Sequence, residues 1–208
     1  NLTDASGVVN LAGPNARGVL EKITDADVSN EALPYAAYRE FDLRGAISIR
    51  AMRLGFMGEL SYELHVPASY MRAVWSLVLH AGGDYGIRPF GLEAQNVLRL
   101  EKGHVIIGQE SEIRTTLHDL RLGFLWHRQK SLYKTVGAPA LKFTEHQDGR
   151  MKLVGFKMEN PERPAKDGAI IVDKTIQGHI CTSRYSFTLG ESIGLALVAS
   201  DLADTGTR

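Results

Sequence analysis

The sequence predicts an α+β fold, in which helices pack on a mostly antiparallel sheet, followed by a small β-barrel domain. Over the first half of the chain, patterns typical of strands and helices follow in the order strand, helix, strand, strand, helix, helix. From Met151 onward, short apolar runs separated by turn residues replace the helical pattern. We therefore expect residues 1–148 to form an α+β core with a connecting segment, and residues 149–208 to form a small partial barrel domain.

The first elements are defined by local patterns. Residues 7–24 read as a short strand, a Gly-Pro turn and a helix that begins near Pro14, where a missing N–H is harmless. Residues 45–55 and 60–66 alternate apolar and polar side chains, which is the period of a strand with one buried face. The glycine-rich turn between them predicts an antiparallel pair.

Two helices are predicted next. Residues 67–83 carry one apolar stripe, and Gly82 and Gly83 can end the helix in the left-handed conformation. The stripe consists of Met71, Val74, Trp75, Val78 and Leu79. A second helix is expected from Pro89 to Gly103, with Ala94, Val97 and Leu98 facing inward.

The rest of the chain divides into a connection and a β region. Residues 108–130 are polar and irregular, residues 136–143 resemble a short helix, and the charged stretch 144–152 resembles a linker. The predicted strands of the barrel lie in four apolar runs: 151–158, 168–173, 177–183 and 192–198.

Composition excludes several classes of protein. Lys and Arg together number 24, as do Asp and Glu, so the chain has no net charge with which to attract nucleic acid or an anionic membrane. No apolar run is long enough to span a bilayer, and the N-terminus does not resemble a signal peptide. With a single cysteine, a reducing, cytoplasmic location is expected. The missing initiator Met and the turn-like last residues suggest a fragment.

Candidate metal and nucleophile sites are weak. None of the seven histidines has the helical spacing and carboxylate partner of a zinc site, so no metal is expected. Cys181 and His179 would share a strand face and could form a reactive pair. A cysteine buried in a strand is more often inert packing, which is the expectation here.

Two charged residues have open interpretations. Glu63 lies in the centre of the polar face of the strand at 60–66, where it is either an ordinary solvent-facing residue or a carboxylate that binds the N–H groups of a ligand. Arg99, near the end of the second helix, is either solvated or bonded to a carboxylate of Glu63 or of a ligand. The polar loops at 108–116 and 182–190 could each contribute to a site.

Four blocks of sequence, in order, resemble the aminomethyltransferase family. They are "NLAGPNARGVLEKIT", "RLGFMGELSYELHVPA", "GLEAQNVLRLEKGHVIIGQES" and the run from "LVGF" through "DGAIIVD" and "GHICTSRYSFTLG" to "SIGLALV". That family includes the glycine cleavage T-protein and the folate-binding regions of sarcosine oxidase alpha subunits. The resemblance implies a three-domain cloverleaf around a tetrahydrofolate pocket.

The resemblance also implies an activity. Tetrahydrofolate would accept a one-carbon unit from an aminomethyl or iminium donor, T-protein-like or sarcosine oxidase alpha-like. The alternatives are a non-catalytic folate-binding module of the same fold and a folate-dependent demethylase. A flavin-containing subunit or a lipoyl carrier protein would be the partner. The family's catalytic aspartate lies upstream of the first residue given, so a fragment would lack it.

Residue by residue, Glu63 matches the family's folate-binding glutamate, the second in Gly-Glu-x-x-x-Glu. Arg99 and Tyr62 are implied as further contacts to the cofactor. Gln95 occupies the place of a folate-contacting arginine in T-proteins. Glu110 and Phe187 stand where the family more often has aspartate and proline.

Overall fold

The computed structural model describes residue 1, residues 3–127 and residues 135–208. The chain forms two compact units, Asn1–Gln95 and Asn96–Arg208, whose boundary falls within one helix. This boundary between compact units lies earlier in the chain than the domain boundary expected between residues 148 and 149. The expected domain boundary stays a prediction. None of the helices in the described ranges is long and apolar enough to cross a membrane.

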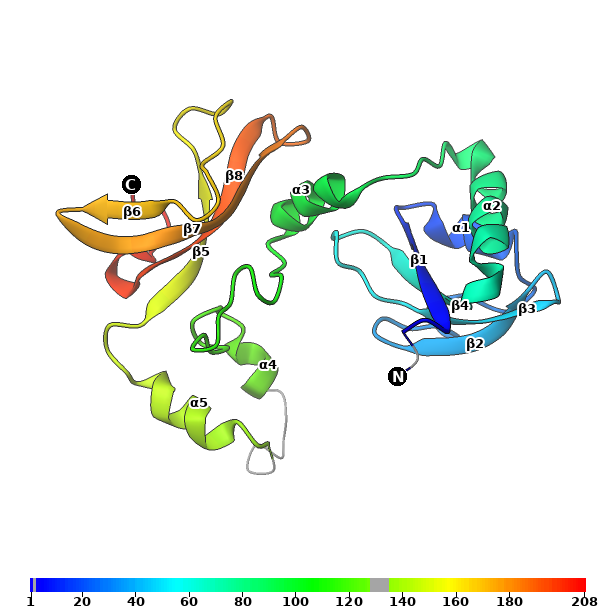
Figure 1. Cartoon of the computed structure of the whole chain (residues 1–208), viewed down its shortest axis with the longest axis horizontal. Coiled ribbons are helices and arrows are strands. Elements are labelled where there is room, and N and C mark those ends of the chain that lie inside the picture. Colours follow the sequence, from blue (N-terminus) through cyan, green and yellow to red (C-terminus); the bar gives the residue numbers. More distant parts are fainter. Residues whose placement is uncertain (2, 128–134) are drawn as a thin grey trace. The chain divides into compact units, whose positions relative to one another are not determined.

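The first unit is a four-stranded antiparallel sheet with two helices (Figure 1). Its strands pair in the order β1-β4-β3-β2, so β1 and β2 are the two edges. The predicted antiparallel pair is confirmed, because the strands at 47–52 and 61–67 are neighbours. The elements are β1 (Ser6–Ala12), α1 (Ala16–Glu21), β2 (Tyr38–Leu43), β3 (Ile47–Met52), β4 (Ser61–Pro67), a 3-10 turn (Ala68–Tyr70), α2 (Met71–Ala81) and a second 3-10 turn (Gly83–Tyr85).

The core of this unit lies on one face of the sheet. Alternation along β4 sends Tyr62, Leu64 and Val66 into it at 0% exposure, where they pack with buried side chains of α1 and α2. The predicted stripe of α2 divides in two. Val74 and Val78 are buried, whereas Trp75 is 44% exposed. The helix period predicted the apolar residues of α2 but could not tell which of them contact the sheet.

α2 ends immediately before Gly82, as the sequence predicted, but the expected left-handed conformation is not found there. Gly82 has a right-handed conformation with φ −83°, and the left-handed glycine is Gly86, with φ +68°, at the end of the short turn that follows. A side chain at Gly82 would collide with Ile87, since an added Cβ would lie 2.6 Å from its side chain.

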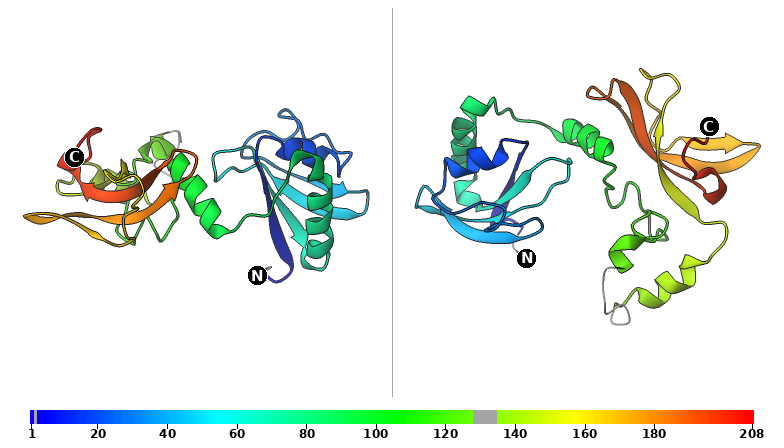
Figure 2. Two further views of the ribbon diagram at one scale, coloured as in Figure 1. Left: turned by 90° about the horizontal axis from the view of Figure 1, so that it is seen from above. Right: turned by 180° about the vertical axis from the view of Figure 1, so that it is seen from behind.

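The second unit contains the barrel-like region. The four predicted apolar runs all form strands, and these pair antiparallel in the order β5-β8-β7-β6 (Figure 2). Apolar clusters cover both faces of the sheet, with Leu195 and Leu197 on one side and Ala196 and Val198 on the other. The elements are α3 (Leu92–Lys102), α4 (Gly123–His127), α5 (Ala138–Glu145), β5 (Met151–Lys157), β6 (Ile170–Asp173), β7 (Thr175–Ser186), β8 (Glu191–Ala199) and a final 3-10 turn (Ser200–Leu202).

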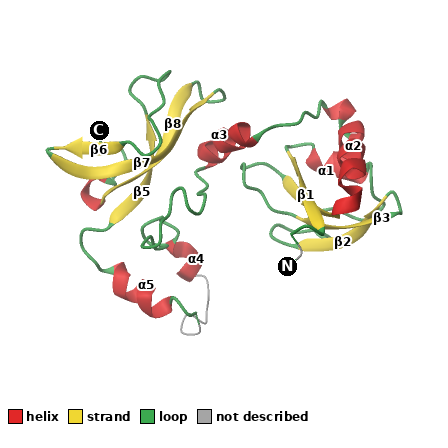
Figure 3. Cartoon of the chain, viewed as in Figure 1, coloured by secondary structure: helices red, strands yellow, loops and turns green. Residues whose placement is uncertain are grey.

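The inward face of α3 differs from the prediction. Ala94 is exposed and Val97 and Leu98 are only partly buried, while Arg99 and Leu100 are buried. The segment between α3 and α4 is loop and turn, as the sequence suggested (Figure 3), but α4 is a helix inside the stretch 108–130 that was predicted to be irregular. The last three residues of the predicted irregular segment, 128–130, lie outside the described residues. The short helix predicted at 136–143 is confirmed as α5.

Candidate functional site

Glu63 lies in the middle of β4, on the face of the sheet opposite the core. β4 is an internal strand, and Glu63 pairs with Asn10 of β1 on one side and with Met52 of β3 on the other. Residues that pair across an antiparallel sheet point to the same face. The Glu63 side chain is 35% exposed, in contrast to its buried neighbour Tyr62. The strand therefore holds this carboxylate on a rigid element with one side open.

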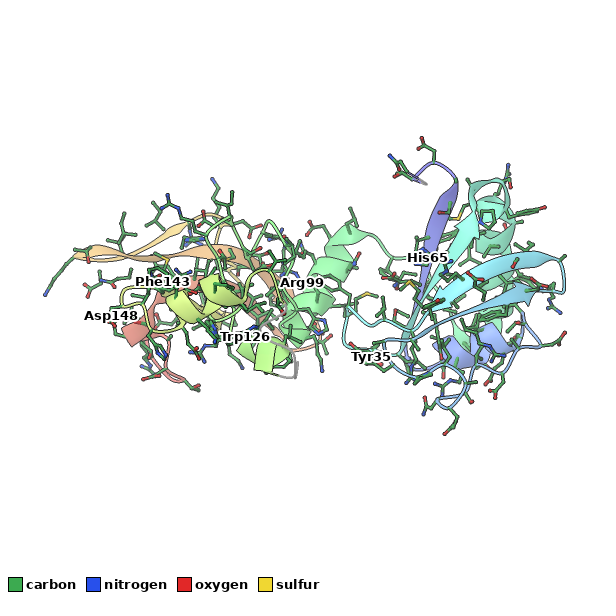
Figure 4. All side chains as sticks on the ribbon, turned by 90° about the horizontal axis from the view of Figure 1, so that it is seen from below. Tyr35, His65, Arg99, Trp126, Phe143 and Asp148 are labelled. Atoms are coloured by element: carbon green, nitrogen blue, oxygen red, sulfur yellow. The ribbon has the colours of Figure 1, made fainter. Side chains whose placement is uncertain are left out.

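His65 stands two residues further along the same face. Its Nε2 lies 3.5 Å from Oε2 of Glu63 and is buried with no hydrogen-bond partner in the described chain. Figure 4 labels His65 on this sheet. A carboxylate beside an unsatisfied ring nitrogen is an arrangement with hydrogen-bonding capacity to spare, because a buried polar group normally has a partner.

Arg50, a cation on this face of the sheet, is already engaged. Arg50 pairs with His65 in the sheet register, but its guanidinium donates to Glu40 of β2 through Nε at 3.0 Å and Nη2 at 2.7 Å. Among the described residues Glu63 forms no ion pair with lysine or arginine. Its carboxylate is therefore open to N–H donors from outside the chain.

Tyr62 points away from Glu63. Its side chain is 0% exposed in the core, and its hydroxyl accepts a hydrogen bond from Nε of Arg17 at 3.1 Å. Arg17 in turn donates to Asn30 at 2.6 Å. Adjacent strand residues face opposite sides, so the strand does not bring Tyr62 and Glu63 together.

Arg99 is fully buried and has a carboxylate partner within its own unit. Its Nη1 lies 2.8 Å from Oε2 of Glu110, and both side chains are 0% exposed. Arg99 also donates to the Asn96 side chain at 2.9 Å and to the carbonyl of His104 at 3.0 Å. Glu110 accepts from the backbone N–H of Ile106 at 2.6 Å. The expectation of a solvated Arg99 was therefore wrong, and the carboxylate that Arg99 contacts is that of Glu110, which the sequence analysis did not name as its partner.

Gln95 lines a groove in the first unit. The groove has a volume of about 530 Å³ and runs beside β1, under α2 and the segment that follows α2. Asn10 also lines it, so the sheet partner of Glu63 is shared between the open face and the groove. Gln95 therefore lines the same groove as the sheet partner of Glu63.

Sequence reasoning missed Asn10 and gave His65 no role. His65 was visible on the polar face of the strand, two residues after Glu63. Asn10 could be found only from the sheet register, which pairs residues more than fifty positions apart. A long-range pairing of this kind leaves no local signal in the sequence.

The remaining candidates from the sequence, which are the cysteine, a metal site and the polar run at 182–190, show no sign of a reactive site. Cys181 is buried in an apolar cluster, and burial, together with the nearby Glu110 carboxylate, raises the pKa of its thiol to about 11. No group of three or more metal-ligating side chains is found in the part of the chain that the structure describes. The run at 182–190 forms the end of the β7–β8 hairpin, where Arg184 pairs with Asp167 at 2.9 Å.

Known proteins resemble the chain along nearly all of its length. A family model described as the GCVT N-terminal domain matches residues 1–130, and one described as the glycine cleavage T-protein C-terminal barrel domain matches residues 151–208. Sarcosine oxidase subunit alpha of Rhizobium meliloti (strain 1021) is 36% identical over 211 residues, which cover 95% of this chain and 21% of that protein. Aminomethyltransferase of Caldanaerobacter subterraneus subsp. tengcongensis is 31% identical over 208 residues, which cover 100% of this chain and 54% of that protein.

A solved structure has the same fold. Aminomethyltransferase T of the glycine cleavage system from Bartonella henselae matches with a TM-score of 0.80 and 25% identity, over 97% of this chain and 54% of that one. The chain therefore spans about half the length of the aminomethyltransferases it matches and about a fifth of the sarcosine oxidase alpha subunit.

Proposed function

Since the chain belongs to the family of the glycine cleavage T-protein, we propose that it takes part in tetrahydrofolate-dependent one-carbon transfer. Its share of that function is to bind the pterin ring through Glu63 on the open face of the β1–β4 sheet. The protein containing it would pass a one-carbon unit from an aminomethyl or iminium donor to the folate. Aminomethyltransferases and sarcosine oxidase alpha subunits are the relatives that motivate this assignment.

The observation that carries the proposal is the state of the Glu63 carboxylate. It is held on an internal strand, about a third exposed, and has no lysine or arginine partner in the described residues. A pterin presents adjacent N–H donors, and a carboxylate accepts two such donors in parallel because it has acceptors only. The residues present therefore fit the group on chemical grounds.

Neighbouring side chains have supporting roles. The unsatisfied Nε2 of His65 would interact with a polar atom of the ring, and that contact would give the buried nitrogen a partner. Gln95, at the groove beside Asn10, would contact the folate more weakly than an arginine would, because an amide carries no charge. The bound folate would supply the nitrogen atoms that accept the carbon.

Arg99 and Tyr62 are proposed to act on the scaffold. Arg99 forms an ion pair with Glu110, and Tyr62 packs in the core and accepts a hydrogen bond from Arg17. Neither would need to contact the ligand for the proposal to hold. This narrows the proposed contacts to Glu63, Gln95 and the two residues, His65 and Asn10, that the structure adds.

Isothermal titration of the full-length gene product with tetrahydrofolate tests the proposal. Wild type should bind, and Glu63→Gln should weaken binding by roughly 5- to 150-fold, corresponding to the 1–3 kcal/mol cost of leaving buried donors unpaired. In a second titration, with the pterin ring alone, Glu63→Gln should weaken binding by the same factor, because the carboxylate contacts that part of the ligand.

Glu40→Gln is the matched control. Glu40 carries the same group on the same sheet, but on the edge strand and already paired with Arg50. The affinity of the Glu40→Gln variant for tetrahydrofolate should stay within about twofold of that of wild type. Absence of binding by the wild type, or equal losses in the two variants, would contradict the proposed role of Glu63.

A further inference from the structure

The stretch between α5 and β5, where the sequence suggested a linker, contains one of two Asp-Gly pairs in the chain. The pairs are Asp148–Gly149 and Asp167–Gly168. In both, the aspartate is exposed in a turn and the glycine is left-handed, with φ +73° at Gly149 and +77° at Gly168. Because the two pairs share their residues and their kind of turn, a difference in their reactivity depends chiefly on their contacts.

An aspartate followed by glycine can rearrange without any other reagent. The glycine nitrogen attacks the side-chain carbonyl carbon of the protonated aspartate, a new N–C bond closes a five-membered succinimide, and the carboxyl oxygen leaves as water. Glycine favours this attack because it has no Cβ to obstruct the nitrogen. Water then opens the ring, and attack at the main-chain carbonyl gives isoaspartate, in which the chain runs through the former side chain. The water lost is regained, and nothing is oxidised or reduced.

Asp148 and Gly149 are not held by contacts with the described residues, and Figure 4 labels Asp148 in the second unit. Among those residues, no group forms a hydrogen bond or ion pair with the Asp148 carboxylate, and none accepts a hydrogen bond from the backbone N–H of Gly149. Both reacting groups are therefore accessible to each other when this exposed turn moves, since few bonds oppose its local opening.

Asp167 and Gly168 are held at the corresponding atoms. Oδ1 of Asp167 accepts a hydrogen bond from the backbone N–H of Ser183 at 3.0 Å, and both carboxylate oxygens lie 2.9 Å from Nη1 of Arg184. The N–H of Gly168 donates to the carbonyl of Ile180 at 2.9 Å. Hydrogen bonds between charged groups are among the stronger ones in proteins. These bonds must open before the nitrogen can reach the carboxyl carbon.

Arg150, which follows the reactive turn, joins it to the rest of the second unit. Its guanidinium binds the Asp119 carboxylate through Nε at 2.8 Å and through Nη2, and it donates to the carbonyl of Arg114 at 2.9 Å. It also donates to the side chain of Gln147 at 3.2 Å, so Gln147 and Arg150 bridge the turn. Isoaspartate at Asp148 would add one carbon to the main chain between them and alter the spacing on which these bonds depend.

We propose that Asp148 is a site of isoaspartate formation in the folded protein, and that its product weakens the contact between Arg150 and Asp119. Asp167 remains aspartate in the folded protein, because its carboxylate and the N–H of Gly168 are engaged. The isoaspartyl residue carries a free α-carboxyl group in an exposed turn, where an isoaspartate-specific carboxyl methyltransferase can methylate it.

Ageing of the full-length gene product at physiological temperature and neutral pH tests the site. Mass-spectrometric peptide mapping measures isoaspartate at both positions, and Asp167 is the matched internal control. In the folded protein, isoaspartate should accumulate at Asp148 about tenfold or more faster than at Asp167, whose bonds must first open. In urea, where both sets of contacts are lost, the two rates should agree within about threefold.

Asp148→Glu is a second control, since glutamate keeps the charge but would have to close a less favourable six-membered ring. Labelling of the aged protein by an isoaspartate-specific methyltransferase should fall in this variant to the level of freshly prepared wild type. Equal rates at Asp148 and Asp167 in the folded protein, or isoaspartate at neither position, would overturn the proposed site.

Urea denaturation of the aged protein tests the effect on Arg150. The midpoint of the isoaspartyl fraction of wild type should fall by about 0.3–1 M, because the contact with Asp119 is weakened. Asp148→Glu aged in the same way should keep its midpoint. An isoaspartyl fraction that unfolds at the same urea concentration as unmodified wild type would overturn the proposed weakening of this contact.

Discussion

Glu63 and Glu110 are the same type of residue in opposite environments. Glu110 is 0% exposed, bonded to Arg99 at 2.8 Å and to a backbone N–H at 2.6 Å. Glu63 is about a third exposed and faces a histidine at 3.5 Å. The comparison teaches that the partner of a charged side chain decides whether that side chain serves the fold or a ligand. A carboxylate whose charge is balanced within the chain supports the fold, whereas one left open on a rigid strand is available to a ligand.

The largest expected effect is the loss of stability on replacing Glu110. Glu110→Ala leaves the Arg99 guanidinium buried without its counter-charge, which costs about 3–5 kcal/mol in the free energy of unfolding. Urea denaturation of the full-length gene product measures it. Glu112→Ala, an exposed glutamate in the same loop, is the control and should stay within about 0.5 kcal/mol of wild type. A loss below about 1 kcal/mol for Glu110→Ala would break the comparison.

Replacing both partners sharpens this test. Nη2 of Arg99 and Oε1 of Glu110 are buried without hydrogen-bond partners among the described residues, so the pair is incompletely satisfied. Arg99→Met combined with Glu110→Leu should therefore lose less stability than Glu110→Ala alone. A double variant less stable than the single one would mean that the ion pair itself holds the loop.

The next effect concerns Asp119, a second carboxylate balanced within the chain. Burial alone would raise the pKa of Asp119, but hydrogen bonds from Arg150 and Thr116 outweigh it and hold the pKa below its ordinary value. The stability from this carboxylate is present above about pH 4 and is lost as pH falls through the lowered pKa. Asp119→Asn should cost about 1–3 kcal/mol at pH 7 and progressively less below pH 4.

Denaturation midpoints between pH 2 and pH 7 check this. Asp148→Asn serves as the control, since Asp148 is exposed. A cost for Asp119→Asn that is the same at pH 2.5 and pH 7 would contradict the role of the charge.

The smallest effect is that of Cys181. Burial and the Glu110 carboxylate raise the pKa of the thiol to about 11, so only about one thiol in a thousand is ionised at pH 8. Iodoacetamide should modify the folded protein far more slowly than the urea-unfolded protein at that pH. Since the folded pKa is raised, the thiol's contribution to stability is complete below about pH 9 and declines toward pH 11. Rapid alkylation of the native protein would show that the thiol is accessible or ionised.

Local patterns predicted most elements of both units. The alternation of β3 and β4 and the short apolar runs of the four barrel strands are properties of neighbouring residues, so the sequence was enough to place them, whereas β2 was not predicted. Trp75 and Arg99 show where such reasoning stops. The period of α2 cannot tell core from groove, and a charged residue at a helix end looks solvated until the loop that contains Glu110 folds over it.

The candidate site was only half predictable. Glu63 was singled out by its place on the polar face of a strand, and the resemblance to a family gave it a role. Asn10 depends on a pairing between distant strands, and the partner of Arg99 depends on how the loop after α3 folds, and no local spacing encodes either contact. The same dependence explains why Tyr62, adjacent to Glu63 in sequence, lies on the other side of the sheet.

Thermal unfolding of Glu63→Gln in the full-length gene product, with and without tetrahydrofolate, tests the central claim most directly. A ligand that binds only the folded state raises Tm. The account predicts that the variant without ligand melts within about 1 °C of wild type, since the Glu63 carboxylate has no lysine or arginine partner in the described residues, and that saturating folate raises its Tm far less than it raises that of wild type. An undiminished folate-induced rise in the variant would contradict it.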